Sequence, residues 1–178
     1  MKKNLTAVFF FSFILVNFAQ SPVSKGVYFL GGSIYYSSQS SDNSDSSTDT
    51  FIFSPRVGYF FIDNFYVGLS VNYDKHSFGD NSSSNYGFGP EVRYYFDANE
   101  KIKPFLGLAY NYRSADGDVS YNTFTVNGGA DLFIARNFAI EGSIDYSIIN
   151  RKSSIPYFST DDTVKRFQVK IGLNYFIF

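Results

Sequence analysis

The sequence predicts an all-β chain that closes into an eight-stranded antiparallel β-barrel, and three observations lead to this fold class. Apolar and polar residues alternate over eight segments, with the period of two that is typical of a β-strand. Two of these segments, residues 53–60 and 88–96, repeat the frame Phe-x-Pro-x-Val-x-Tyr-aromatic. The connections between segments are alternately long and short, which predicts an up-and-down meander with long connections at one end.

The eight expected strands differ clearly in composition from their connections. They cover about residues 25–37, 51–61, 65–75, 85–96, 103–113, 121–134 and 138–149, and a last segment after residue 162 that ends the chain. The expected long connections are residues 38–50, 76–84, 114–120 and 150–162. The first of these is almost wholly Ser, Asp, Thr and Asn, which predicts a mobile loop. Pro55 and Pro90 fall inside expected strands, where each removes a ladder donor, so we expect a bulge at each.

The N-terminus has the pattern of a cleaved signal peptide. Lys2 and Lys3 precede an apolar stretch from residue 5 to residue 18, and the small residue Ala19 suits a cleavage site. We therefore expect residues 1–19 to be a signal peptide and residues 20–178 to be one barrel domain. The chain has no cysteine, which excludes a disulfide and a cysteine-linked lipid anchor.

Composition indicates a barrel that spans a membrane. Aromatic residues make up 21% of the chain, yet the mean hydropathy is −0.12, and no apolar run after the signal approaches the length of a spanning helix. An exported, aromatic-rich, alternating chain of this kind is typical of the bacterial outer membrane. The rhythm of the connections then places both mature termini in the periplasm and the long connections outside the cell. A soluble carrier would instead place its polar residues outside the barrel.

The apolar positions are also sorted by depth into two aromatic belts around an aliphatic band. The expected periplasmic belt consists of Tyr28, Tyr59, Phe61, Phe65, Tyr94, Phe96, Phe138 and Tyr175. The expected outer belt consists of Tyr36, Phe53, Tyr73, Phe88, Tyr112, Phe124, Tyr146 and Phe167.

Three segments resemble the bacterial outer-membrane-protein β-barrel-domain family, whose small porin-like barrels are similar in build to OmpA and OmpX. They are residues 54–60, residues 103–107 and the terminal segment 172–178, and the resemblance covers residues 26–178. It implies the fold, and it implies that the barrel-assembly machinery recognises the C-terminal strand through its final Phe. The extra residue after Tyr175 departs from the usual Tyr-x-Phe ending of the family, and we expect no periplasmic peptidoglycan-binding domain to follow.

Charged residues on the polar face of the expected strands point into the lumen. They are Arg56, Glu91, Arg93, Asp131, Glu141, Asp145 and Lys170. Eight strands leave a lumen just wide enough for side chains, so we expect ion pairs that plug the barrel. This predicts a non-enzymatic surface or envelope-structural protein that acts through its extracellular loops. A narrow porin-like channel for ions or small solutes is the alternative, and a lipid A-modifying enzyme is a more remote one.

The sequence offers little for catalysis, metal binding or nucleic acid. His76 is the only histidine, with Asp74 on the same face and Ser77 on the opposite face, and a charged lumen does not suit an acyl chain, so we expect no catalytic residue. The loop aspartates lack calcium-loop spacing, and we expect neither a metal nor a cofactor; they are Asp42, Asp45, Asp116 and Asp118. A formal net charge of −1 argues against nucleic acid. The expected partners are outer-membrane lipid, including lipopolysaccharide, and an unidentified ligand of the loops.

Overall fold

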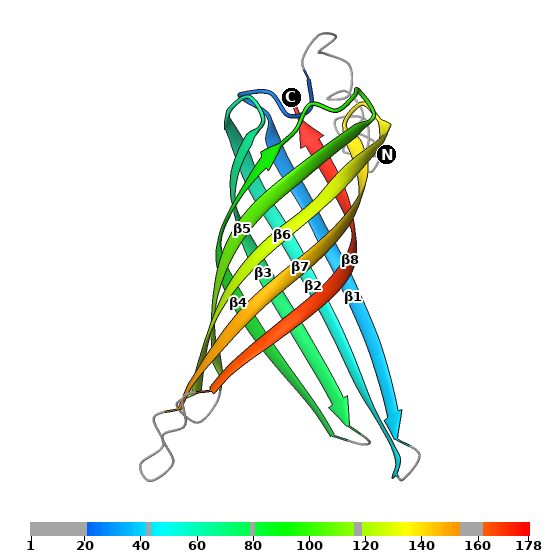
Figure 1. Cartoon of the computed structure of the whole chain (residues 1–178), viewed down its shortest axis with the longest axis vertical. Coiled ribbons are helices and arrows are strands. Elements are labelled where there is room, and N and C mark those ends of the chain that lie inside the picture. The colour runs from blue at the N-terminus through cyan, green and yellow to red at the C-terminus, as the bar shows by residue number, and fades with distance from the viewer. Residues whose placement is uncertain (1–20, 42–43, 79–80, 116–118, 154–161) are drawn as a thin grey trace, which may run out of the picture.

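The computed structural model describes residues 21–41, 44–78, 81–115, 119–153 and 162–178, which form a closed barrel of eight antiparallel strands (Figure 1). The strands are β1 (Tyr28–Ser41), β2 (Ser44–Ile62), β3 (Phe65–Phe78), β4 (Asn81–Tyr95), β5 (Ile102–Ala115), β6 (Val119–Ala135), β7 (Phe138–Ser153) and β8 (Asp162–Ile177). They pair in chain order and β8 returns to β1, so the predicted eight-stranded meander is confirmed. No helix of the described residues is long and apolar enough to cross a membrane. The predicted signal peptide lies outside the described residues.

The strands extend further toward the long connections than the sequence predicts. The β1–β2 ladder continues to the pair Ser40–Ser47, so the prediction that residues 38–50 form a loop was wrong. The reason is that ladder hydrogen bonds join backbone groups, and a polar composition does not prevent two adjacent strands from pairing. The other predicted long loops are shortened in the same way, because β3 ends at Phe78 and β7 ends at Ser153.

The bulges predicted at Pro55 and Pro90 are also absent. Pairing of β2 with β3 skips two positions after Phe53 and resumes at Arg56 in unchanged register, and pairing of β4 with β5 is interrupted in the same way around Pro90. Each proline therefore leaves a gap in one ladder without adding a residue to the strand. The register shifts that the described strands do contain lie at hairpin ends.

The two faces of the barrel have opposite character. Leu69, Val169 and Ile171 point outward and are 59, 61 and 64% exposed, whereas lumen-facing residues such as Glu141 and Asn174 are fully buried. Exposed aromatic residues occur at both ends of the barrel, as the belts require; examples are Tyr28, Phe61 and Tyr94 at one end and Tyr36, Phe88 and Phe167 at the other. An apolar exterior around a polar interior is the arrangement of a membrane barrel.

Candidate functional site

An apolar cluster, which we call the aromatic plug, fills the lumen at the end where the short connections lie. Its buried members are Val23, Val27, Phe29, Phe60, Tyr66, Tyr95, Phe105, Ala139 and Phe176, and Phe133 and Phe178 pack against them. The rings meet edge-on or tilted, with centroids 4.8 Å apart for Phe29 and Tyr66 and 5.3 Å apart for Phe29 and Phe176. Such geometry is favourable for aromatic pairs.

The segment before β1 covers this end of the barrel. The Gly26 amide donates to the carbonyl of Phe60 at 2.9 Å, and the amide of Asn64 donates to the carbonyl of Val23 at 2.7 Å. These bonds hold Val23 and Val27 in the same buried cluster as Phe60. The segment before β1 therefore closes the plugged end of the barrel.

Glycines on the lumen face make room for the plug. A Cβ atom on Gly58 or Gly68 would collide with the ring of Tyr66, which lies across β2 and β3. The missing side chains thus allow a large buried ring to lie flat against the barrel wall.

Next to the plug lies a buried charged layer centred on Glu141. The guanidinium of Arg56 donates to both carboxylate oxygens of Glu141, at 3.2 and 2.7 Å, and Arg93 Nη1 donates to Oε2 at 2.8 Å. Glu91 lies 3.7 Å from Arg93 Nε, an ion pair too long for a hydrogen bond. Side chains of Glu141, Arg93 and Glu91 are 0, 2 and 4% exposed, so this layer is buried within the barrel.

Asp131 joins the same layer through neutral partners. It accepts hydrogen bonds from the Tyr95 hydroxyl at 3.1 Å and from Asn174 Nδ2 at 2.7 Å, and the same nitrogen of Asn174 donates to Glu141 at 2.8 Å. Arg93 lies over the ring of Phe105 with 4.4 Å to the centroid, which links the charged layer to the plug. The two layers form one packed unit.

The remaining two predicted residues lie further toward the long connections. Lys170 pairs with Asp145 at 2.8 Å in the wall of a cavity. The structure thus brings five of the seven sequence-predicted residues into one layer and separates Asp145 and Lys170 from it.

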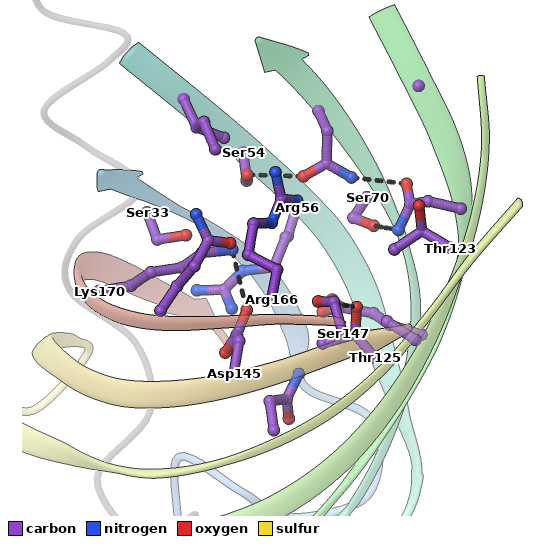
Figure 2. Close-up of a pocket in the computed structure, with 18 of the residues that line it drawn as sticks. Ser33, Ser54, Arg56, Ser70, Thr123, Thr125, Asp145, Ser147, Arg166 and Lys170 are labelled. Carbon is purple, nitrogen blue, oxygen red and sulfur yellow. Dashed lines mark hydrogen bonds and ion pairs between the residues drawn. The ribbon is translucent and has the colours of Figure 1, made fainter. Parts of the chain in front are cut away.

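The cavity begins at the charged layer and occupies the lumen beyond it, with a volume of about 80 Å³ (Figure 2). Its wall carries hydroxyl and amide groups: Ser54 donates to Asn72 at 2.6 Å, and Asn72 donates to Asn111 at 2.6 Å. A second pair, Thr125 and Ser147, is joined at 2.8 Å. A polar space of this size holds several water molecules.

Sequence reasoning missed the plug and several polar groups. The signal for the plug was present, because Phe29, Tyr66 and Phe105 share the lumen phase and all lie near the start of their strands. An ion pair between Arg113 and Asp74 at 2.7 Å was not predicted either. Its members come from β5 and β3, which flank β4, and sequence alone does not reveal that the two side chains meet on the lumen side of β4.

A further ion pair joins Asp97, on the connection between β4 and β5, to Lys103 at the start of β5. Asp97 accepts hydrogen bonds from Lys103 Nζ at 2.6 Å and from Asn64 Nδ2 at 3.0 Å. These bonds lower the pKa of the Asp97 carboxyl, and the bond from Lys103 makes the largest contribution. They tie two neighbouring short connections together at the plugged end.

The other candidates from the sequence gain no support as sites. The backbone register places His76 opposite Thr50 and Ser83, and its side chain lies outside the described part of the chain. Asp42 and the aspartates at 116 and 118 also lie outside the described residues. Within the described residues, no group of three or more His, Cys, Asp and Glu could hold a metal ion.

An apolar exterior, aromatic belts and a filled polar lumen define a small barrel of the outer-membrane class. Residues 5–176 match the family model for the outer membrane protein beta-barrel domain, and the chain belongs to this family. Family membership places the barrel in the bacterial outer membrane. No curated protein matches the sequence.

Solved structures show the same fold at low sequence identity. Neisserial surface protein A is 18% identical with a TM-score of 0.56, and the match covers 86% of this chain and 98% of that one. The N-terminal β-barrel domain of Pseudomonas aeruginosa OprF is 13% identical with a TM-score of 0.51, covering 86% and 98%. The E. coli outer membrane protein W is 17% identical with a TM-score of 0.51, covering 85% and 97%. These likenesses concern the fold alone.

Proposed function

We propose that the protein is a closed, non-enzymatic structural barrel of the outer membrane that acts through its long connections outside the cell. The observation that carries this proposal is the closure of the lumen. The aromatic plug and the charged layer lie in series across the barrel, and both are buried. A solute path would have to pass through both layers.

The proposed orientation follows from the two ends of the barrel. The short connections, residues 21–27 and the C-terminal end of β8 lie together at the plugged end, which we assign to the periplasm (Figure 1). The long connections then lie outside the cell. We further propose that the barrel-assembly machinery recognises β8, whose outward residues Tyr175 and Ile177 remain exposed, while Phe178 packs against the plug.

A narrow channel is the second candidate, because the polar cavity occupies part of the lumen. Hydroxyl and amide groups line it, as they would a path for small solutes. The path nevertheless ends at Glu141 and its two arginines. The cavity therefore favours a dead-ended vestibule over a channel.

Liposome swelling separates these two functions. Liposomes that contain the refolded protein should stay as impermeable to small sugars and amino acids as empty liposomes, while a general porin in the same preparation gives rapid swelling. A swelling rate that rises with the amount of protein would establish the channel and reject the closed barrel.

The non-enzymatic part of the proposal has its own test. Overexpression of the wild-type protein should leave the acylation pattern of lipid A unchanged, and His76→Ala should give the same pattern. Altered acylation that the His76→Ala variant abolishes would show that the protein is an enzyme.

A further inference from the structure

The ladder between β1 and β8 stops halfway along the barrel. It pairs Tyr28 with Ile177 at one end and Ile34 with Ile171 at the other, and in the described residues it goes no further. Both strands continue: β1 pairs with β2 to Ser41, and β8 pairs with β7 to Asp162. Residues 35–41 and 162–170 thus form a seam, which we call the β1–β8 seam, where β1 and β8 diverge (Figure 1).

The seam begins at a depth that lies within the membrane. Six residues separate Tyr28, in the aromatic belt of the plugged end, from Ile34. At about 3.3 Å per residue and a tilt of about 40°, this distance is about 15 Å along the membrane normal, within an apolar band about 25 Å tall. Backbone groups at the seam have no strand partner on this side, and hydrocarbon does not satisfy them. Polar groups from the cavity side can satisfy them there.

The β8 side of the seam presents two kinds of side chain in alternation. Phe167 and Val169 point outward and are 64 and 61% exposed, toward the membrane. Arg166, Gln168 and Lys170 point inward and line the cavity (Figure 2 labels Arg166 and Lys170). An apolar exterior thus lies directly beside a polar, cationic interior.

Two inward donors at the seam are left without a partner. Gln168 is 3% exposed, yet its Nε2 makes no hydrogen bond in the described part of the chain, and neither does Arg166 Nε. Buried amide and guanidinium donors are costly to leave unpaired. Both donors are therefore available to an acceptor in the cavity that they line.

The nearby carboxylates are already engaged. Asp74 and Asp145 act electrostatically on Arg166, but Asp74 is held by Arg113 at 2.7 Å and Asp145 by Lys170 at 2.8 Å. Among the described residues, Arg166 forms no ion pair. The positive charge of Arg166 is therefore balanced only at longer range.

We propose that Arg166 and Gln168 form a binding site for a phosphate-bearing anion, which enters the cavity through the β1–β8 seam. The guanidinium of Arg166 matches the oxygens of a phosphate, and Gln168 Nε2 supplies a second donor on the same face of β8. The phosphate belongs either to a lipid headgroup, whose acyl chains stay outside against Phe167 and Val169, or to a soluble phosphate in the cavity. A closed lumen does not conflict with this site, since the ligand approaches from the side.

The test uses isotope-labelled, refolded protein in uncharged maltoside micelles, with the side-chain nitrogen signals of Arg166 and Gln168 followed by NMR. One arm adds inorganic phosphate against chloride at equal ionic strength. The other adds phosphatidylglycerol against phosphatidylcholine. We expect saturable shifts of both signals, and the arm with the tighter binding identifies the source of the phosphate.

The matched variants are Arg166→Gln and Lys165→Gln, which remove the same charge from adjacent positions on opposite faces of β8. Arg166→Gln should weaken binding by about tenfold or more, and Lys165→Gln should leave it unchanged. If Arg166→Gln does not fold, Gln168→Leu serves in its place with the same expected direction. Absence of a saturable shift in both arms, or equal weakening by Lys165→Gln, would overturn the proposal.

Discussion

At the scale of single residues, the closure of the lumen depends on Glu141. Its carboxylate is fully buried and accepts hydrogen bonds from Arg56, Arg93 and Asn174. Two arginines that share one carboxylate are both stranded when it is removed, whereas the loss of either arginine leaves the other pair intact. Substitution of Glu141 should therefore disrupt the charged layer more than substitution of either arginine.

Replacement of this residue gives the first prediction. Glu141→Ala should lower the free energy of unfolding by about 3–5 kcal/mol, because it leaves buried cations without their partner. This free energy is measured by unfolding the protein with urea from lipid vesicles. The heat-dependent gel shift of the barrel reports the fraction that stays folded. Ser143→Ala, on the same strand and the same face with 5% exposure, is the control and should cost far less. Equal effects of the two changes would show that the ion pairs do not stabilise the barrel.

A second prediction concerns the space that glycine provides for the plug. Gly68→Ala places a methyl group against the ring of Tyr66 and should destabilise the barrel by about 1–3 kcal/mol through overpacking. Gly142→Ala is the control, because a Cβ atom there meets nothing within 4 Å. Comparison of the two unfolding curves tests the packing, and a Gly68→Ala barrel as stable as the Gly142→Ala barrel would contradict it.

At the scale of elements, the sequence predicts which residues form strands and which way they point. Period-two alternation is a local signal, so residues such as Leu69 and Glu91 could be assigned to the outer and inner faces without a structure. The ends of the strands could not be predicted, since residues 44–50 pair through backbone groups that any side chain allows. The bulges predicted at the two prolines are absent for a related reason, because the ladder tolerates the loss of single hydrogen bonds.

The candidate site was predictable only in part. Alternation predicts which charged residues face the lumen, including Arg56 and Glu141. It does not predict which of them form ion pairs, because the pairing depends on the stagger of the strands around the barrel. Asp131 was expected among the ion pairs of the lumen, and it instead accepts hydrogen bonds from Tyr95 and Asn174. The seam could not be predicted either, since each of its strands alternates normally.

At the scale of the whole molecule, the barrel has one plugged end and one end with a vestibule. The natural absence of cysteine allows this orientation to be tested by labelling. The Asp162→Cys variant should react with a membrane-impermeant maleimide on intact cells. The Arg136→Cys variant should react only after the outer membrane is opened. The reverse pattern would invert the proposed topology.

The presence of two buried layers in the lumen also leads to a prediction about which of them blocks ion flow. Because the plug and the charged layer lie in series, removal of one leaves the other in place. Glu141→Ala alone should therefore remain closed, and the combination of Glu141→Ala with Phe60→Ala and Tyr66→Ala should create a conducting lumen. The triple variant also serves as the positive control for the wild type.

Single-channel conductance in planar lipid bilayers tests the central claim most directly. We expect the refolded wild-type protein to be nearly silent at voltages where the triple variant shows steady steps. Steady conductance from the wild type, of the same size in Glu141→Ala, would show that the lumen is open and that the buried layers do not close it.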